Sequence, residues 1–352
     1  MQSFKAIGLM SGTSLDGVDL AACEFTLENG RWSYLIRAAH TFPYPEEWSV
    51  RLSGLPSGDA VTLARTHVEY GHFLGQLAKS FISSTGFTPL LIASHGHTIF
   101  HQPENGFTCQ IGSGSAIAAE TGLPVASDFR SLDVALGGQG APLVPVGDRL
   151  LFGEYQACLN LGGFANVSME SHEGRIAFDI CPVNIVLNHL AGKLGLAYDR
   201  DGECARKGEV HQDLLEELNQ LDYYGRPYPK SLGREWVESC LYPVLIRGKI
   251  NTVDLLRTYS EHAAFQVTRA MEIAEVRKIL VTGGGARNCF LIERFRHYSR
   301  NEFHLPDNSL IDFKEALVFA FLGVLRYKGD SNVLKSVTGC SRDHSGGMIF
   351  NI

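Results

Sequence analysis

The hydrophobic pattern of this chain repeats one local plan, in which a short apolar run ends in a turn of small residues that contains glycine. Four runs follow this plan, over residues 6–12, 90–96, 157–163 and 279–285. A short apolar run bounded by glycine is typical of a buried strand followed by a tight loop. We therefore expect four strands, each with a loop at its end, to organise the fold.

The first and third runs share a longer pattern. Each is followed by a second strand-like run, a turn that contains glycine (29–30 and 173–174) and a third strand-like run (32–42 and 175–180). This order predicts a meander of three antiparallel strands, used twice along the chain.

Each meander is followed by helical sequence, over residues 59–85 in the first half and 254–273 in the second. In the first of these helices Asp59 is a suitable N-cap. Its expected buried stripe consists of Leu63, Val68, Phe73 and Leu77. Two halves with one plan indicate an ancestral duplication, and the strand-helix alternation of any α/β protein remains the alternative.

A chain of 352 residues is long for one small domain, so we expect an α/β protein of two lobes. The loop 128–145 carries several glycines and two prolines and is the expected crossover. An ordered loop of this length is more often a site than a spacer. The expected lobes are residues 1–140, completed by 335–352, and residues 141–334.

Composition and charge exclude several classes of protein. There are 31 Lys and Arg against 38 Asp and Glu, with a net charge of −7 and no basic run, so nucleic acid is not an expected partner. The longest apolar stretch, 316–325, is too short to cross a membrane, and the start of the chain does not read as a signal peptide. The eight cysteines form no C-x-x-C pair, which predicts reduced thiols in a cytoplasmic protein.

The turn after the first strand combines small residues, hydroxyls and two carboxylates. Its backbone N–H groups and hydroxyls suit a phosphate, and a carboxylate there can hold Mg²⁺ through water. No lysine follows the glycine, so this is not a Walker loop. The expected nucleotide-binding residues are Gly12, Thr13, Ser14, Leu15, Asp16, Gly17, Val18 and Asp19. A plain turn that caps its own backbone is the alternative.

Two further glycine turns strengthen the nucleotide hypothesis. One occupies the matching place in the second meander, and the other opens a helix, where an N-terminus favours an anion. The residues concerned are Gly162, Gly163, Gly283, Gly284, Gly285 and Asn288. Neither a complete G-x-G-x-x-G fingerprint nor a protein-kinase HRD loop is present.

Six segments resemble one known family. They are GLMSGTSLDGVDLA (8–21), ASHGHTIFHQP (93–103), QIGSGSAIAAETGLPVASDFRSLDVALGGQGAPLVP (110–145), LNLGGFANVS (159–168), PKSLGREW (229–236) and VTGGGARN (281–288). In this order, and over essentially the whole chain, they resemble anhydro-N-acetylmuramic acid kinases.

The resemblance implies the fold of the actin, sugar-kinase and Hsp70 superfamily, with two RNase-H-like (actin/hexokinase-like) lobes and ATP in the cleft between them. It also implies an enzyme of peptidoglycan recycling that uses ATP, Mg²⁺ and water. Such an enzyme opens the 1,6-anhydro bridge of anhydro-N-acetylmuramic acid and phosphorylates O6. A homodimer is the assembly that the resemblance implies.

This reaction requires a base that activates water at the anomeric carbon, whereas the departing oxygen takes the phosphoryl group. The resemblance assigns the base to Asp179, at the end of the third strand of the second meander. A carboxylate that caps the helix beginning near Asn184 is the alternative.

The resemblance also suggests which residues contact the sugar. Arg130 can bind a carboxylate bidentately, and Asp133 can orient it or accept a sugar hydroxyl. His95 and Glu315 are further candidates. A structural pair between Arg130 and Asp133, and a helix-start role for Glu315, remain the alternatives.

The chain departs from the family pattern beside Asp179. The family usually has Asp-Thr-Gly-Pro-Gly-Asn, whereas this chain has Cys181 and Val183 in place of the two glycines. If a glycine there needed a positive φ, the loop must differ locally. A related kinase for another amino sugar, or a silent ATP-binding protein, is therefore the alternative function.

Two other features bear on the site. Ser113 stands where the family commonly has aspartate, which removes a charge near the expected sugar side. His95, His97 and His101 lack a nearby third carboxylate, so we expect no metal other than Mg²⁺ held with ATP.

Overall fold

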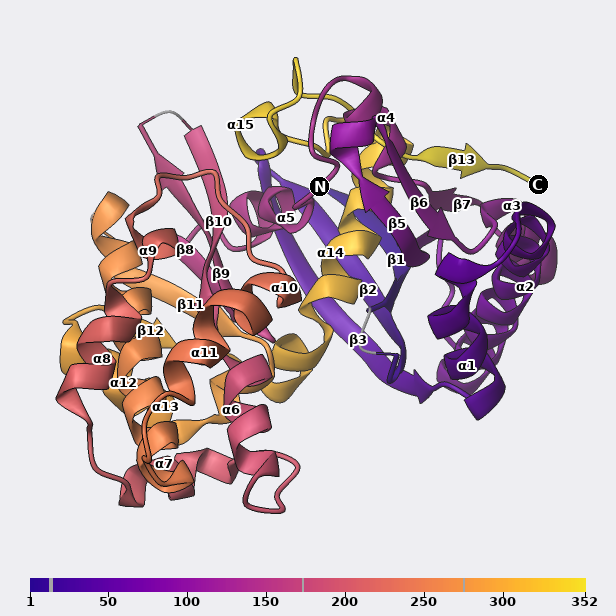
Figure 1. The fold of residues 1–352 in the computed structure, drawn as a ribbon. Helices are drawn as coiled ribbons and strands as arrows, with labels where there is room; N and C mark the ends of the chain where they lie inside the picture. Colours follow the sequence, from indigo (N-terminus) through magenta and orange to yellow (C-terminus); the bar gives the residue numbers. More distant parts are fainter. Residues whose placement is uncertain (13–14, 173, 275) are drawn as a thin grey trace. The chain divides into compact units, whose positions relative to one another are not determined.

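The computed structural model describes residues 1–12, 15–172, 174–274 and 276–352. The chain divides into two compact units (Figure 1). The first unit contains Met1–Leu151 and Phe313–Ile352, and the second contains Phe152–Asp312. The sequence-based boundaries differ from this division at both ends, because residues 141–151 and 313–334 belong to the first unit.

Within the described residues, the first unit contains a six-stranded sheet with the order β13-β7-β4-β1-β2-β3. Its strands are β1 (Gln2–Ser11), β2 (Gly17–Glu28), β3 (Arg31–Pro43), β4 (Leu91–Ser94), β7 (Val125–Ser127) and β13 (Met348–Phe350). Strands β1 to β3 form an antiparallel meander, β4 runs parallel to β1, and β7 runs parallel to β4. The predicted first meander and the strand after the first long helix are confirmed.

The two faces of this sheet are covered differently because successive side chains of a strand point to opposite sides. Ile7 of β1 packs in a buried cluster with Leu74 of α2 (Ala60–Thr85). A Cβ on the neighbouring Gly8 would lie 1.8 Å from the carbonyl oxygen of Ala316 in the long helix α14 (Asn308–Lys328). Helix α14 therefore packs directly on the β1 backbone.

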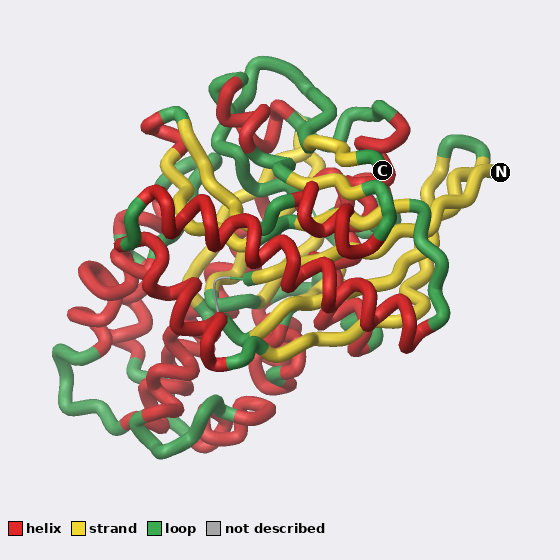
Figure 2. The backbone as a smooth tube through the Cα atoms, turned by 90° about the vertical axis from the view of Figure 1, so that its right-hand side faces the viewer, coloured by secondary structure: helices red, strands yellow, loops and turns green. Residues whose placement is uncertain are grey.

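Apart from α14, the other elements of the first unit are short. They are α1 (Glu46–Gly54), η1 (Leu55–Ser57), β5 (His97–Gln102), η2 (Pro103–Asn105), β6 (Phe107–Ile111), α3 (Gly114–Thr121), α4 (Ser131–Ala135), α5 (Val144–Leu151), α14 (Asn308–Lys328, which begins in the second unit) and α15 (Lys335–Thr338). Strands β5 and β6 form a separate two-stranded sheet, and the tube view shows all strands of the chain in yellow and the helices in red (Figure 2).

The described part of the second unit repeats the plan with a five-stranded sheet in the order β10-β9-β8-β11-β12. Its strands are β8 (Ala157–Leu161), β9 (Phe164–Ser171), β10 (Gly174–Pro182), β11 (Lys278–Thr282) and β12 (Glu302–His304). Strands β8 to β10 form the antiparallel meander, and β11 and β12 continue it in parallel. The order matches β3-β2-β1-β4-β7, so both units have the expected RNase-H-like α/β topology.

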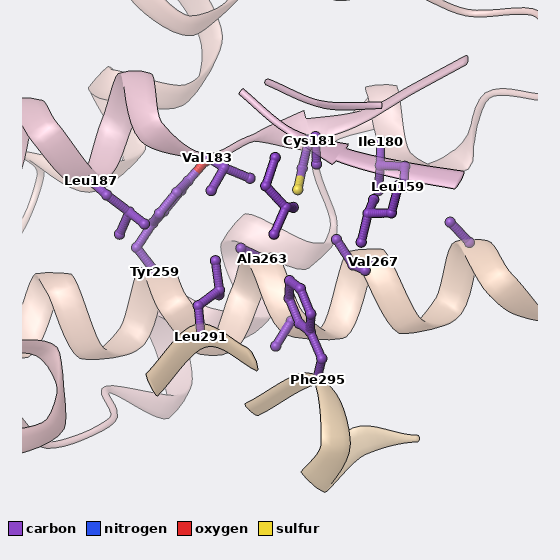
Figure 3. Packing of buried hydrophobic residues seen from close by; sticks show 14 of the residues in the cluster. Leu159, Ile180, Cys181, Val183, Leu187, Tyr259, Ala263, Val267, Leu291 and Phe295 are labelled. Carbon is purple, nitrogen blue, oxygen red and sulfur yellow. The ribbon is translucent and has the colours of Figure 1, made fainter. Parts of the chain in front are cut away.

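The core of the second unit forms between its sheet and the helix α12 (Thr252–Met271). Its other helical segments are α6 (Asn184–Gly192), η3 (Arg200–Gly202), α7 (Glu203–Lys207), α8 (Gln212–Asn219), α9 (Asp222–Gly225), α10 (Arg234–Trp236), η4 (Val237–Leu241), α11 (Tyr242–Leu245), η5 (Glu272–Ala274), η6 (Gly284–Arg287) and α13 (Cys289–Tyr298). Figure 3 shows Cys181 and Val183 in this core, on the side of the sheet that faces Tyr259 and Val267 of α12.

The first long helix begins as predicted but buries a different face. The Thr62 N–H donates to Asp59 Oδ1 at 2.7 Å, which is the expected N-cap. The predicted stripe is wrong in part, because Val68 is 44% exposed. The helix buries Tyr70, Leu74, Ala78 and Phe81 instead, together with Gly71 and Gly75, where a Cβ would clash with α3.

The loop 128–145 lies within the first unit and is not the crossover that the sequence suggested. The Gln139 N–H donates to the carbonyl of Thr338 at 2.8 Å, and the Ser341 N–H donates to that of Leu136 at 3.2 Å. The C-terminal segment therefore holds this loop. Among the described residues, no helix has the length and apolar character that crossing a membrane requires.

Candidate active site

Asp179 lies where β10 departs from regular pairing. Asp179 is opposite Asn166 of β9, and Cys181 is opposite Ala165, so the ladder has an irregularity at Ile180. A bulge of this kind bends a strand and changes the direction of the neighbouring side chains. The local structure therefore gives Asp179 an orientation that a regular strand would not.

The segment 229–236 fixes Asp179 from outside the sheet. The Asp179 N–H donates to the carbonyl of Lys230 at 3.1 Å, and the Leu232 N–H donates to Asp179 Oδ2 at 2.9 Å. The hydroxyl of Tyr223 donates to the Asp179 carbonyl at 2.6 Å. The position of the carboxylate is therefore set by two elements beyond its own strand.

The alternative role of Asp179 as a helix cap does not match this geometry. The first N–H groups of α6 point at backbone carbonyls, since the N–H groups of Val183 and Ile185 both donate to Gly163, at 2.8 and 3.2 Å. The Asp179 carboxylate instead accepts from Leu232. Burial raises the pKa of Asp179, and the Leu232 N–H opposes this rise. A carboxylate with a raised pKa is a better proton acceptor.

The loop that departs from the family pattern does not need a residue with positive φ at either substituted position. Val183 has a φ of −129°, and Cys181 is not among the described residues with positive φ. Both side chains are fully buried. The two positions therefore add apolar side chains to the core without left-handed strain.

The glycines of the two turns in the second unit fall into two groups. A Cβ on Gly283 or Gly285 would lie within 2.9 Å of Leu161 atoms, so packing alone requires glycine there. A Cβ on Gly162 or Gly163 would meet no described protein atom closer than 3.4 Å, and one on Gly284 would meet none within 4 Å.

Gly162, Gly163 and Gly284 also lack a positive φ. Neither backbone conformation nor protein packing thus explains glycine at these positions. The open backbone at these three positions leaves room for a ligand to approach the main chain closely.

The side chain of Asn288 forms a hydrogen bond within the protein. Its Oδ1 accepts from the Leu291 N–H at 3.0 Å and caps α13. Beside it, Arg287 donates to Asp312 Oδ2 at 2.7 Å. The glycine turn therefore runs directly into a capped helix, as the sequence suggested.

In the first unit, the turn between β1 and β2 lies partly outside the described residues, which omit Thr13 and Ser14. Leu15 has a φ of 58°, and Gly17 faces the carbonyl of Phe42, 2.4 Å from where a Cβ would lie. Asp19 Oδ1 accepts from the Thr41 hydroxyl at 2.6 Å.

The remaining predicted members of this turn differ in exposure. Val18 is fully buried, Gly12 is half-buried and Asp16 is exposed. The structure thus gives Gly17 and Val18 a packing role within the sheet. In the described part of the turn, Gly12, Leu15, Asp16 and Asp19 offer surface to a ligand.

A buried polar network that the sequence did not reveal supports the start of this turn. Ser11 Oγ shares hydrogen bonds with His97 Nδ1 at 2.8 Å and with the Tyr44 hydroxyl at 2.6 Å. The Tyr44 hydroxyl is in turn hydrogen-bonded to Tyr70. Burial lowers the pKa of His97 to about 4, so its ring is neutral at pH 7. The histidine was visible in the sequence, but nothing there linked the two tyrosines to it.

His95 and Arg130 form a second hydrogen-bonded polar group. His95 Nδ1 donates to the carbonyl of Gly96 at 2.9 Å, so its Nε2 accepts from Arg130 Nε and Nη2 at 3.1 and 2.9 Å. Arg130 Nη1 donates to the carbonyl of Gly140 at 2.7 Å. Burial lowers the pKa of Arg130 to about 10, opposed by the charges of Glu315 and Asp133, so the guanidinium stays charged at pH 7.

Asp133 is fully buried, and both of its carboxylate oxygens accept hydrogen bonds from other groups of the protein. Oδ2 accepts from the Gly140 N–H at 2.6 Å, and Oδ1 accepts from Thr338 and His344 at 2.8 and 3.0 Å. The structure therefore gives Asp133 an internal role in place of the sugar contact that we expected. It is linked to Arg130 through Gly140 and is not its direct hydrogen-bond partner.

Two other candidates take positions that the sequence did not predict. Glu315 lies two turns inside α14, so the helix-start alternative is wrong, and its side chain is exposed. Ser113 is the N-cap of α3, where its Oγ accepts from the Ala116 N–H at 3.3 Å.

The three histidines considered for a metal have separate partners, since His101 pairs with Thr108, at 3.0 Å, rather than with His95 or His97. In the part of the chain that the structure describes, one group of three residues has donor atoms close enough for a cation. It consists of Asp133, Cys340 and His344.

The family model described as anhydro-N-acetylmuramic acid kinase matches residues 4–352 of this chain. The curated anhydro-N-acetylmuramic acid kinase of Aliivibrio fischeri is 35% identical, with 98% of this chain and 99% of the relative covered. That of Vibrio cholerae is 36% identical, with 98% and 97% covered. A solved ROK hexokinase from Thermus thermophilus is 14% identical, covers 91% of this chain and 99% of its own, and has a TM-score of 0.40. The fold of this chain follows from the strand order of its two sheets.

Proposed function

Because the chain belongs to the anhydro-N-acetylmuramic acid kinase family, we propose that it uses ATP and water to convert anhydro-N-acetylmuramic acid to N-acetylmuramic acid 6-phosphate. The reaction is a phosphotransfer to an alcohol oxygen, coupled to hydrolysis of the 1,6-anhydro bridge, and it belongs to peptidoglycan recycling. The observation that carries the proposal is the bulged, externally clamped Asp179 at the end of β10.

In this mechanism Asp179 takes one proton from water as the water oxygen bonds to C1 of the sugar. The C1–O6 bond breaks with its electron pair on O6, and O6 bonds to the γ-phosphorus as ADP departs. Asp179 then releases its proton to solvent. The Leu232 N–H holds Oδ2 in one orientation, which keeps the base aligned without removing its charge.

ATP supplies the phosphoryl group, and Mg²⁺ neutralises charge on its phosphates. The fit of this chain to a nucleotide rests on the open backbone at Gly162, Gly163 and Gly284. Their N–H groups can approach phosphate or ribose oxygens where any side chain would intervene. The carboxylates of Asp16 and Asp19 would hold Mg²⁺ through water.

On the sugar, Arg130 is the residue that we assign to the lactyl carboxylate. Three of its five N–H groups donate to His95 and Gly140, which fixes the plane of the guanidinium. A planar cation held in this way suits a carboxylate. His95 would thus act on the sugar through Arg130, and exposed Glu315 would accept a sugar hydroxyl.

We also propose a cytoplasmic location and a homodimeric assembly for the protein. A cytoplasmic location agrees with the use of ATP and with the absence of disulfides among the eight cysteines. A homodimer is the assembly that we expect, and light scattering of the purified protein measures it.

The proposal is tested by incubating the purified protein with Mg-ATP and anhydro-N-acetylmuramic acid, measuring ADP and weighing the sugar product. We expect a product heavier by one phosphoryl group (HPO3) and one water. Asp179→Asn keeps the shape of the side chain and should lower the rate by at least about 10²-fold. An unchanged sugar with the wild-type protein, or a variant as fast as wild type, would contradict the assignment.

A further inference from the structure

The group formed by Asp133, Cys340 and His344 takes no part in the proposed reaction. The three residues are 0%, 5% and 7% exposed, and one donor atom of each lies within 4.8 Å of those of the other two. A carboxylate oxygen, a thiol sulfur and an imidazole nitrogen are the donor types that bind zinc. We propose that these residues form a binding site for a divalent cation of the zinc class.

The three donors come from two segments that the fold brings together. Asp133 lies in α4, and the other two lie in the C-terminal segment, separated by three residues. Short spacing of two ligands on one turn is common at zinc sites. Gly339, with a φ of 76°, ends α15 and turns the chain immediately before Cys340. Two ligands are thus supplied by one short turn.

The carboxylate is already oriented by donors that do not need a metal. The Gly140 N–H donates to Asp133 Oδ2 at 2.6 Å, and the Thr338 hydroxyl donates to Oδ1 at 2.8 Å. Hydrogen bonds of this kind hold ligating carboxylates at known metal sites.

The backbone of His344 is fixed as well. It forms a two-way bridge with Val333, with N–O distances of 3.1 and 3.2 Å. The buried side chain of Asn332 holds the same turn, because it accepts from the Gly346 N–H at 2.6 Å. Two of the three donors are therefore preorganised.

The spacing of the oxygen and nitrogen donors requires little movement, and the Cys340 sulfur lies within 4.8 Å of both. Asp133 Oδ1 and His344 Nε2 are 3.0 Å apart, whereas two such ligands on a tetrahedral zinc ion are about 3.3 Å apart. The cation would replace the proton that these two atoms share. That proton moves to Nδ1 of His344, a buried atom without a hydrogen-bond partner among the described residues.

Charge also favours a divalent cation. The Cys340 thiol donates to the carbonyl of Arg342 at 3.1 Å. On binding, the thiol proton leaves to solvent and the sulfur bonds to the metal as a thiolate. One carboxylate and one thiolate then balance a dication, so the buried group is neutral overall.

The consequence for the fold is a link between the C-terminal segment and the loop 128–145. Asp133 holds the N–H of Gly140, whose carbonyl accepts from Arg130. A bound cation would therefore stabilise the loop that carries Arg130. This consequence rests on the proposed function, whereas the site itself does not.

The test uses the full-length protein, freed of metal and titrated with Co²⁺ under reducing conditions. We expect one equivalent to give the visible bands of tetrahedral cobalt and the near-ultraviolet thiolate-to-cobalt band, and Zn²⁺ to displace them. Cys340→Ser and His344→Gln should weaken binding at least about tenfold. Cys240→Ser, which removes an exposed thiol elsewhere, should bind as wild type does.

Thermal unfolding supplies an independent readout. Zn²⁺ should raise the unfolding midpoint of wild type and of Cys240→Ser, but not that of Cys340→Ser. Circular dichroism establishes that each variant is folded. Wild type without a thiolate-to-cobalt band, or a band that persists in Cys340→Ser, overturns the proposal. Neither readout depends on kinase activity, so failure of the site and failure of the proposed function are distinguishable.

Discussion

For some single residues of the site the sequence indicated the role, and for others it did not. Asp179 was identified by resemblance to a motif, and the structure adds the bulge and the Leu232 N–H that orient it. Asp133 was expected at the sugar because the family resemblance suggested that it orients Arg130 or accepts a sugar hydroxyl. Its burial depends on Thr338 and His344, which lie some 200 residues further along the chain. No local pattern contains that information.

The raised pKa of Asp179 leads to a pH prediction. As a base, Asp179 must be ionised, so kcat should fall as the pH drops through a pKa above the ordinary carboxyl value. The stability effect has the opposite sign. A carboxyl whose pKa is higher in the folded than in the unfolded chain destabilises the fold when it is ionised.

At pH 8, Asp179→Asn should therefore have an unfolding midpoint at or above that of wild type, although its activity is lost. Scanning calorimetry of both proteins at pH 8 and at pH 5 measures this. A variant that is markedly less stable than wild type at pH 8 would show that the carboxylate stabilises the fold.

At the scale of elements, strands were predicted better than helix faces. Runs of apolar residues ended by glycine located β1, β4, β8 and β11, because buried strands and tight turns both leave strong local signals. The buried face of α2 was partly missed, since it consists of Tyr70, Leu74, Ala78 and Phe81, with Gly71 and Gly75 at the contact with α3. Hydrophobic periodicity counts large side chains and does not register close packing on glycine.

The turn after β11 offers a matched pair of substitutions. A Cβ at position 285 would lie 2.8 Å from the Cβ of Leu161, whereas one at position 284 meets no described atom within 4 Å. Gly285→Ala should thus lower the free energy of unfolding by about 1–3 kcal/mol. Gly284→Ala should leave it nearly unchanged and raise the KM for ATP several-fold.

Denaturant unfolding and steady-state kinetics at varied ATP measure the two effects. An unchanged KM in a stable Gly284→Ala protein would remove this turn from the nucleotide site. Equal stability of the two variants would show that the contact with Leu161 is easily relieved.

At the scale of the whole molecule, the repeated meander correctly indicated two units with one topology. The expected boundaries were displaced because α14 begins in the second unit and continues as a covering helix of the first sheet. A hydrophobic helix does not reveal from its own sequence which of two sheets it covers. The contact at Gly8, made across more than 300 residues, decides this assignment.

The separate cores of the two units lead to a prediction about cooperativity. Gly8→Ala would bring a Cβ to 1.8 Å from the Ala316 carbonyl, so α14 must move away from β1. Amide hydrogen exchange should become faster in β1, β4 and the part of α14 that follows Asp312, and stay unchanged in β8 and β11, whose buried cluster contains no residue of β1 or β4. Equal acceleration in both units would show that they unfold as one.

The central claim is that Asp179 activates a water molecule that becomes part of the sugar product. The most direct measurement is the reaction in ¹⁸O-labelled water, followed by mass spectrometry of the sugar phosphate before its anomeric hydroxyl exchanges with solvent. We predict one ¹⁸O atom at C1 and none in the transferred phosphate, with the labelled product lost in Asp179→Asn. A phosphorylated sugar without label at C1 would contradict the account, because the bridge would then have been opened without water.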